Sequence, residues 1–164
     1  MKHNILVCPV AFNENVKLKS VIERYLAAPC RAFSDYLVID DCSTDGTTEM
    51  IQSFAAQNVK TIKHQKRSGV GVAIRTAIQY AQQQGYEVLV IMAGNDKDNP
   101  NEIERLVDPI LKDGLDFVQD DPAAAVGQRR RSPQGSARDV ADEILHSDRH
   151  HRLRTAGGSS GDRG

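Results

Sequence analysis

Two adjacent carboxylates, Asp40 and Asp41, follow a β-branched apolar run and precede Cys42 and a Ser/Thr/Asp/Gly cluster at residues 43–47. Burying an ionised carboxylate is costly unless it is paired or bound, and ligands of open α/β sheets lie at the carboxyl ends of the strands. The pair therefore predicts a site for a polar ligand. The competing interpretation is a structural hydrogen bond to backbone amides for Asp40 and helix capping for Asp45, which leaves Asp41 as the strongest ligand candidate.

A second polar segment, residues 9–15, follows the first apolar run of the chain. Pro9 ends the hydrogen bonding of a strand because it has no N–H. Phe12 offers a flat face for a nucleobase, and Glu14 offers a carboxylate for polar ligand groups. A hydrophobic staple with a helix cap would explain the same residues. This segment therefore supports a ligand site only in combination with the other segments.

A third segment, residues 66–71, places Gly69 and Gly71 at the start of a predicted helix, next to Lys66 and Arg67. Backbone amides at a helix N-terminus favour phosphate, and the two cations add to that preference. The alternative is a plain turn. The position of these glycines in the chain differs from that in the dinucleotide-binding fingerprint, where the glycines come directly after the first strand.

A fourth segment, residues 93–100, follows the most apolar run. Asn95, Asp96 and Asp98 offer the hard oxygen ligands that Mg²⁺ and Mn²⁺ prefer. The alternative is a polar turn in which Asn99 caps the following helix. Three oxygen donors at the end of a central strand favour the metal site.

The elements that must position these segments alternate between strand and helix patterns. Such alternation predicts an α/β fold with a doubly wound, mostly parallel sheet, in which the four segments share one edge. The predicted strands are 5–10, 36–40, 59–63, 87–92 and the start of a fifth at 115–119. The predicted helices are 16–26, one capped at 44 or 45 and running to 57, 71–83, and one from 99 or 100 to 112.

Length, charge and cysteine content narrow the class of protein. The chain has 164 residues, a net charge of -1 and three widely spaced cysteines without a CxxC pair. One domain is expected, no nucleic-acid partner is indicated, and the cysteines fit a reducing, cytoplasmic location. No run approaches the ~20 apolar residues of a membrane span, so we expect membrane association only through other segments or subunits.

The composition changes sharply near residue 120. All eight aromatic residues and all eight lysines lie within residues 1–117, whereas eight of the thirteen arginines lie within residues 120–164. A segment so poor in apolar residues cannot bury enough surface to offset chain entropy. The pattern predicts a truncated α/β domain over residues 1–119 and a disordered tail over 120–164, produced by a change of reading frame or an artificial junction.

Three motifs carry a resemblance to a known family: residues 9–14 (Pro-Val-Ala-Phe-Asn-Glu), 38–47 (Val-Ile-Asp-Asp-Cys-Ser-Thr-Asp-Gly-Thr) and 69–73 (Gly-Val-Gly-Val-Ala). Together they resemble the nucleotide-sugar-binding half of family-2 glycosyltransferases of the GT-A fold, and the dolichol-phosphate-sugar synthase type is similar. The resemblance covers residues 4–119. It implies a nucleotide-sugar site made by Pro9, Phe12, Glu14, Asp40, Asp41, Gly69, Gly71 and Arg75.

The resemblance also implies roles for these residues and a reaction. Pro9, Phe12 and Glu14 would line the base and ribose pocket, Asp41 would contact the nucleoside, and Arg75 would approach the same ligand. The implied reaction is inverting transfer of a sugar from a UDP- or GDP-linked donor to a lipid-phosphate or glycan acceptor, at the cytoplasmic face of the membrane.

The chain departs from the family pattern in two places. The family has Asp-x-Asp after the fourth strand, but Ala93 and Asn95 occupy the two Asp places here. Asp96 and Asp98 could then hold Mg²⁺ or Mn²⁺ in a shifted geometry, or Lys97 could neutralise the diphosphate instead. The family's general base and acceptor site come from the half after the fifth strand, which the stretch after residue 119 does not resemble. We therefore name no base and expect the chain to retain donor binding alone.

Two other functions fit parts of the pattern. One is a non-catalytic nucleotide-binding or regulatory fragment with the same fold. The other is a receiver-type phosphoacceptor domain, in which an acidic pair binds Mg²⁺. That arrangement places the pair after the first strand, whereas Asp40 and Asp41 follow the second, which makes it the weaker alternative.

Overall fold

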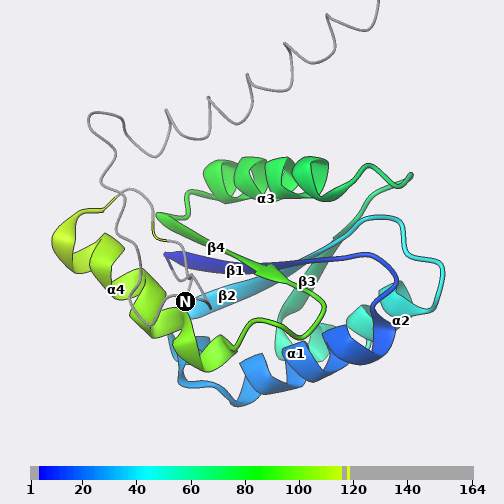
Figure 1. Ribbon diagram of the computed structural model, residues 1–164, viewed down its shortest axis with the longest axis horizontal. Helices are drawn as coiled ribbons and strands as arrows, with labels where there is room; N and C mark the ends of the chain where they lie inside the picture. Colours follow the sequence, from blue (N-terminus) through cyan, green and yellow to red (C-terminus); the bar gives the residue numbers. More distant parts are fainter. Residues whose placement is uncertain (1–3, 116–117, 119–164) are drawn as a thin grey trace, which may run out of the picture.

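The computed structural model describes residues 4–115 and 118 of the chain. Over this part strands and helices alternate, as the apolar patterns predict (Figure 1). The elements, with η marking a 3₁₀ turn, are β1 (Ile5–Ala11), α1 (Asn15–Ala27), η1 (Pro29–Ala32), β2 (Ser34–Asp40), α2 (Thr47–Gln52), η2 (Ala55–Gln57), β3 (Val59–Lys63), α3 (Val70–Gln84), β4 (Val88–Ala93), η3 (Pro100–Glu102) and α4 (Ile103–Asp113).

The four described strands form one parallel sheet in the order β3-β2-β1-β4. The chain builds outward from β1 through β2 to β3 and then returns to place β4 on the other side of β1. This is the order of doubly wound nucleotide-binding sheets, whereas a receiver-type sheet sets its first and third strands side by side. The order therefore confirms the predicted α/β class and argues against the receiver-type alternative.

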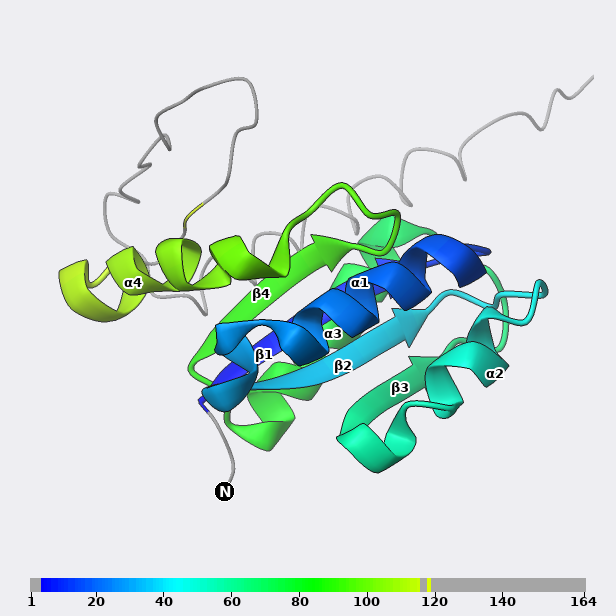
Figure 2. The same cartoon turned by 90° about the horizontal axis from the view of Figure 1, so that it is seen from below.

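Alternate residues of each strand pack on opposite faces of the sheet. Ile5 and Val7 of β1 belong to the larger core, which α1, α2 and α4 cover, and Leu6 and Cys8 belong to the smaller core under α3. Figures 1 and 2 show this division, with α1, α2 and α4 on one face of the sheet and α3 on the other. The buried residues of α3 are alanines (Ala73, Ala77 and Ala81), and the partly buried Tyr80 packs beside them.

The helix ends follow local chemistry. Gly85 ends α3 in the left-handed conformation, at φ 68°, as its place after the apolar stripe predicts. The segment predicted to be helical as far as residue 57 behaves differently, because α2 ends at Gln52. The Ser53 hydroxyl donates to the Met50 carbonyl at 2.6 Å, a local hydrogen bond that competes with helix continuation. Asn58, at φ 64°, then turns the chain into β3.

The helix predicted from residue 99 or 100 is divided into η3 and α4. Asn99 acts as the predicted cap, since its side-chain oxygen accepts from the Asn101 amide at 3.2 Å. Pro109 lies inside α4 without ending it. Most of the predicted fifth strand, at 115–119, lies outside the described residues. No described helix has the length and apolar character needed to span a bilayer.

The end of β4 lies unusually close to β1. The Gly94 amide donates to the Val10 carbonyl at 2.9 Å and so extends the pairing of the two strands. A Cβ atom on Gly94 would lie 2.9 Å from both the Ala11 Cβ and the Val10 oxygen. Only glycine fits there without displacing the backbone of β1.

We expect Gly94→Ala to lower the free energy of unfolding by about 1–3 kcal/mol, because the added methyl group overpacks the β1–β4 contact. Urea unfolding of the full chain measures this. Gly71→Ala is the matched control, because a Cβ there meets nothing within 4 Å and alanine favours a helix by about 1 kcal/mol. Equal losses in the two variants would contradict the close-approach explanation.

Candidate functional site

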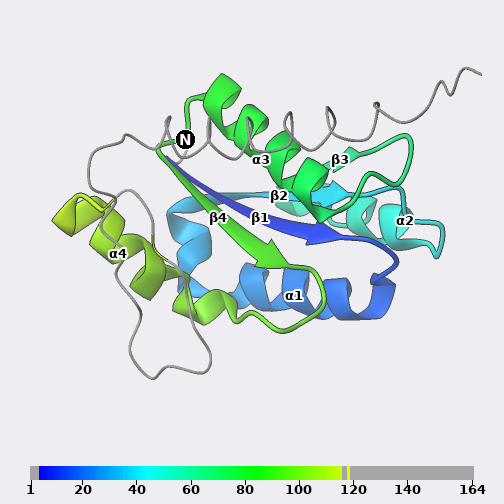
Figure 3. The ribbon, with the colours of Figure 1, turned by 45° about the horizontal axis from the view of Figure 1, so that its top comes forward.

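A cleft of about 520 Å³ opens where β1 and β4 end and α3 begins. Figure 3 shows β1 and β4 running side by side toward this edge of the sheet. Strand order reverses between β1 and β4, and ligands of open α/β sheets bind at such a switch point. The cleft is lined by Val10, Ala11, Phe12, Glu14, Asp41, Arg67, Gly69, Val70, Ile91, Met92, Ala93, Gly94 and Asn95.

The loops after β1 and β2 are tied together by side-chain hydrogen bonds. The Asn13 amide donates to the Ser43 hydroxyl at 2.9 Å, and the Asn13 side-chain oxygen accepts from the Thr44 amide at 2.8 Å. Asp45 accepts from the amide of Asn15 at 3.3 Å and from that of Thr47 at 3.1 Å. Asp45 thus contacts the first residues of two helices. The N-cap of α2 is Gly46, at φ 86°, and not the predicted Thr44 or Asp45. These bonds hold the segment that carries Phe12 and Glu14.

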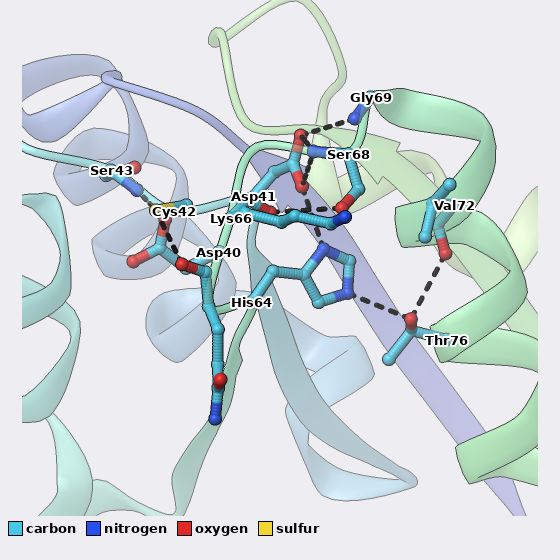
Figure 4. Close-up of polar contacts among 11 residues, drawn as sticks. Asp40, Asp41, Cys42, Ser43, His64, Lys66, Ser68, Gly69, Val72 and Thr76 are labelled. Atoms are coloured by element: carbon cyan, nitrogen blue, oxygen red, sulfur yellow. Dashed lines mark hydrogen bonds and ion pairs between the residues drawn. The ribbon is translucent and has the colours of Figure 1, made fainter.

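Asp41 is the most heavily hydrogen-bonded acid of the cleft (Figure 4). Its Oδ1 accepts from the Ser68 amide at 2.9 Å and faces His64 Nδ1 at 2.8 Å; its Oδ2 accepts from the amides of Gly69 at 2.7 Å and Ser68 at 3.1 Å. A carboxylate has about four acceptor positions, and these contacts fill them. Asp41 therefore lies in the cleft wall, only 3% exposed, with its acceptor capacity used by the protein.

Asp40 has a separate, fully internal environment. Its Oδ1 accepts from the Ser43 amide at 2.9 Å, and its Oδ2 accepts from the Thr48 hydroxyl at 2.5 Å. The side chain is buried and does not line the cleft. Asp40 therefore connects the end of β2 to α2, as the structural interpretation of its sequence position predicts.

The pKa of Asp41 reflects two opposed effects. Burial raises the pKa, but the hydrogen bonds from His64 and from the Ser68 and Gly69 amides outweigh burial and hold the pKa below the ordinary value of 3.8. Each of these donors favours the charged form. Asp41 is therefore a carboxylate at neutral pH, and the folded chain is stabilised by that charge.

Arg67 and Phe12 lie in contact in the cleft lining. The Arg67 guanidinium carbon lies 4.1 Å from the centre of the Phe12 ring, which is within the range of a cation–π interaction. Stacking on the ring restricts the long side chain and leaves the edges of the guanidinium available to a ligand. A planar fork of this kind matches phosphate oxygens.

The fourth loop does not assemble the predicted metal ligands. The Asp96 carboxylate pairs with Arg24 of α1, and Asp98 Oδ2 accepts from the Ala93 amide at 2.5 Å. Asn95 lines the cleft, and its buried Oδ1 has no hydrogen-bond partner among the described residues. In the described part of the chain no three His, Cys, Asp or Glu side chains converge on a point. One neutral oxygen is a poor fit to Mg²⁺ or Mn²⁺, which take several oxygens including carboxylates.

The structure thus brings together some of the predicted site residues and not others. Those that line the cleft are Phe12, Glu14, Asp41, Gly69 and Asn95, and those that do not are Pro9, Asp40, Gly71, Arg75, Asp96 and Asp98. The interpretation of the sequence missed the apolar wall formed by Val10, Val70, Ile91 and Met92. It also missed His64, although a polar residue directly after the third strand belongs to the same edge of the sheet.

Comparison with known proteins adds a family to this geometry. The family model described as glycosyl transferase family 2 matches residues 7–161. The match runs past residue 119, where the resemblance of the motifs ends. The predicted nature of residues 120–164 stays a prediction, since they lie outside the described part.

Three curated relatives are similar to the chain over part of its length. A UDP-N-acetylglucosamine–dolichyl-phosphate N-acetylglucosaminyltransferase of Methanococcus voltae is 24% identical over 143 residues, which are 79% of this chain and 53% of the relative. An undecaprenyl-phosphate mannosyltransferase of Micrococcus luteus is 32% identical over 79 residues, which are 47% of this chain and 32% of the relative. A polyprenol monophosphomannose synthase of Mycolicibacterium smegmatis is 29% identical over 108 residues, which are 64% of this chain and 40% of the relative. The chain therefore spans about half of these relatives or less.

Solved structures support the same fold. The mannosyltransferase PcManGT of Pyrobaculum calidifontis, in complex with GDP-Man and Mn²⁺, has a TM-score of 0.54 at 21% identity, covering 66% of this chain and 34% of its own. Residues 1–349 of TarS of S. aureus, in complex with UDP-GlcNAc, give a TM-score of 0.57 at 19% identity. The match covers 78% of this chain and 37% of the TarS chain. These likenesses show a GT-A-type fold.

We expect Asp41→Asn to lower the free energy of unfolding at pH 7 by about 2 kcal/mol, because the amide replaces one acceptor oxygen with a donor that faces other donors. The deficit should narrow as the pH falls below 3.8, the ordinary value that the Asp41 pKa lies under. The reason is that the stability given by a lowered pKa is lost once the native carboxylate takes up a proton.

Urea unfolding of both chains from pH 7 to pH 3 measures the deficit. Asp108→Asn is the control, since Asp108 pairs with Lys112 on the exposed face of α4, and we expect no measurable change there. A deficit that is constant across the pH range would contradict the assignment of a lowered pKa to Asp41.

Proposed function

We propose, since this chain belongs to glycosyl transferase family 2, that its cleft binds the UDP- or GDP-linked sugar donor of an inverting glycosyltransferase. The observation that carries the proposal is the meeting of four post-strand loops at the β1/β4 switch point, with an aromatic ring, a stacked arginine and an acid in one cleft. A base, a diphosphate and ribose hydroxyls need these three kinds of group.

The cleft residues divide these tasks by their chemistry. Phe12 offers its ring to the base, and Glu14 offers acceptor oxygens to ribose hydroxyls. The start of α3 is less available to phosphate than its glycines suggest, because the Gly69 amide already donates to Asp41 at 2.7 Å. Arg67 is the cation that lines the cleft, so we assign it to the diphosphate.

The acceptor part of the proposal rests on the relatives. Their names contain dolichyl-phosphate, undecaprenyl-phosphate and polyprenol monophosphomannose. We propose a lipid phosphate as the acceptor class, with a glycan as the alternative, and the cytoplasmic face of the membrane as the place of reaction. The acceptor oxygen attacks the anomeric carbon from the face opposite the diphosphate, which leaves with the bonding electron pair. A phosphate monoester loses its second proton near pH 6, so such an acceptor is already anionic and the need for a general base is small.

The metal part of the proposal follows from the fourth loop. A divalent ion would neutralise the leaving diphosphate in this family, and the similar mannosyltransferase structure holds Mn²⁺. In this chain, Asn95 supplies one neutral oxygen, while Asp96 and Asp98 are engaged with Arg24 and the Ala93 amide. We propose that donor binding here relies on Arg67, with Lys97 on the exposed fourth loop as a second cation, rather than on a metal.

We expect the full chain to bind UDP, GDP or one of their sugars in calorimetric titration, and Arg67→Ala to weaken that binding about tenfold, or about 1.4 kcal/mol. The loss follows from removal of the charged fork opposite the phosphates. Lys112→Ala removes a cation from α4, outside the cleft, and should leave affinity unchanged. Absence of binding to all of these nucleotides would overturn the proposal. Binding without turnover on a polyprenyl phosphate would favour the non-catalytic alternative.

A gain of metal dependence tests the cation assignment. We expect chelation of Mn²⁺ to leave donor affinity of the unchanged chain within about twofold, and to weaken the double variant Ala93→Asp/Asn95→Asp by about tenfold. The two carboxylates would restore the oxygen ligands that a divalent ion requires. Calorimetric titration with and without chelator measures both chains. A strong loss on chelation in the unchanged chain would show that Asn95 and its neighbours hold a metal after all.

A further inference from the structure

We infer that His64 is a positioning residue for residues 65–69, the segment that supplies Arg67 and Gly69 to the cleft wall, and that it acts through the carboxylate of Asp41. The inference rests on the proposed function, because Arg67 is the residue that we assign to the diphosphate. His64 directly follows β3 and is not among the residues that line the cleft. Its role is therefore exerted through other groups and not by contact with a donor.

The contacts of His64 join three elements (Figure 4). Its backbone amide donates to the Asp40 carbonyl at 2.8 Å, which continues the pairing of β3 with β2. Its Nδ1 faces Asp41 Oδ1 at 2.8 Å, and its Nε2 faces the Thr76 hydroxyl of α3 at 2.9 Å. The side chain is 13% exposed. Both ring nitrogens are thus engaged, and the ring has a defined orientation.

The partner of Nδ1 fixes the direction of that hydrogen bond. Asp41 is a carboxylate and can only accept, so Nδ1 donates to Asp41. The Thr76 hydroxyl lies 3.1 Å from the Val72 carbonyl and 2.9 Å from His64 Nε2. A hydroxyl both donates and accepts, so Thr76 holds Nε2 whichever of the two groups donates.

Both ends of the segment 64–69 are hydrogen-bonded to the carboxylate of Asp41. His64 holds Asp41 from one end of the segment, and the Ser68 and Gly69 amides hold it from the other. Residues 65–67 lie between these two attachments, so their path is fixed at both ends. Arg67 is the member of this loop that lies over Phe12. Releasing the His64 end would free the Asp41 carboxylate to rotate and would loosen the wall that presents Arg67.

Charge makes the same arrangement matter for an anionic ligand. The ionisable side chains that line the cleft are Glu14, Asp41 and Arg67. Two of these side chains are acids and one is a base, so the position of Arg67 decides whether a diphosphate meets a positive charge. Fixing the segment that carries Arg67 therefore matters for donor binding.

Two variants with an amide side chain distinguish the contact of His64 Nδ1 from that of Nε2. The Asn side-chain nitrogen is as many bonds from Cα as Nδ1, so His64→Asn keeps a donor for Asp41 and loses the Thr76 contact. The Gln side-chain nitrogen corresponds to Nε2, so His64→Gln keeps the Thr76 contact and loses the donor to Asp41. Neither variant carries a charge, and both remain polar. If His64 served only as packing, the two variants would behave alike.

The first measurement is amide hydrogen exchange in the full chain, which needs no donor. We expect the Ser68 and Gly69 amides to exchange at least about tenfold faster in His64→Gln, and within about twofold of the unchanged chain in His64→Asn. The Leu37 amide in the buried part of β2 is the internal reference for global stability. Equal exchange at Ser68 and Gly69 in all three chains would overturn the inference.

The second measurement is the dissociation constant of the nucleotide sugar found by titration. We expect about a tenfold loss of affinity in His64→Gln and about a twofold change at most in His64→Asn. Equal affinity in His64→Gln and in the unchanged chain would overturn the link between His64 and the donor site. The two proposals can fail separately. If the unchanged chain binds no nucleotide but the Ser68 and Gly69 amides still exchange faster in His64→Gln, the proposed function is rejected and the positioning role of His64 is retained.

Discussion

The carboxylate of Asp41 joins three segments that lie far apart in the sequence: the end of β2, the residue after β3, and the start of α3. The Ser68 and Gly69 amides approach it within 3.1 Å, and His64 Nδ1 lies at 2.8 Å. Because the group is buried, its charge is tolerated only while these donors surround it. The position of the α3 start, and with it one wall of the cleft, therefore depends on this one group.

The other wall depends on strand order. Since β4 lies beside β1 and β3 lies at the far edge, the loops after β1 and β4 face α3 across the reversal point. The Gly94 amide continues the β1–β4 pairing, and its missing side chain allows the two strands to stay close at their ends. The cleft is thus a consequence of topology, and side chains such as Phe12 and Arg67 adapt it to a ligand.

The fourth loop shows how carboxylates near a site can serve structure. Asp96 connects the loop to Arg24 of α1, and Asp98 closes the loop on the Ala93 amide. Both carboxylates are therefore engaged with the protein itself, and neither lines the cleft. The cation that lines the cleft is Arg67, held over an aromatic ring, and this is the basis for proposing a donor site with little need of a metal.

The sequence by itself determined the elements and the edge of the sheet at which chemistry would gather, because apolar periodicity and glycine caps act locally. It placed Phe12, Glu14, Asp41 and Gly69 at that edge, where the structure has them in one cleft. Tertiary structure alone decided which acids are engaged internally and which neighbours complete the wall. Residue type gives the charge of Asp96 or Asp41, whereas the approach of Arg24 or of His64 depends on helix and strand packing across 72 and 23 residues of chain.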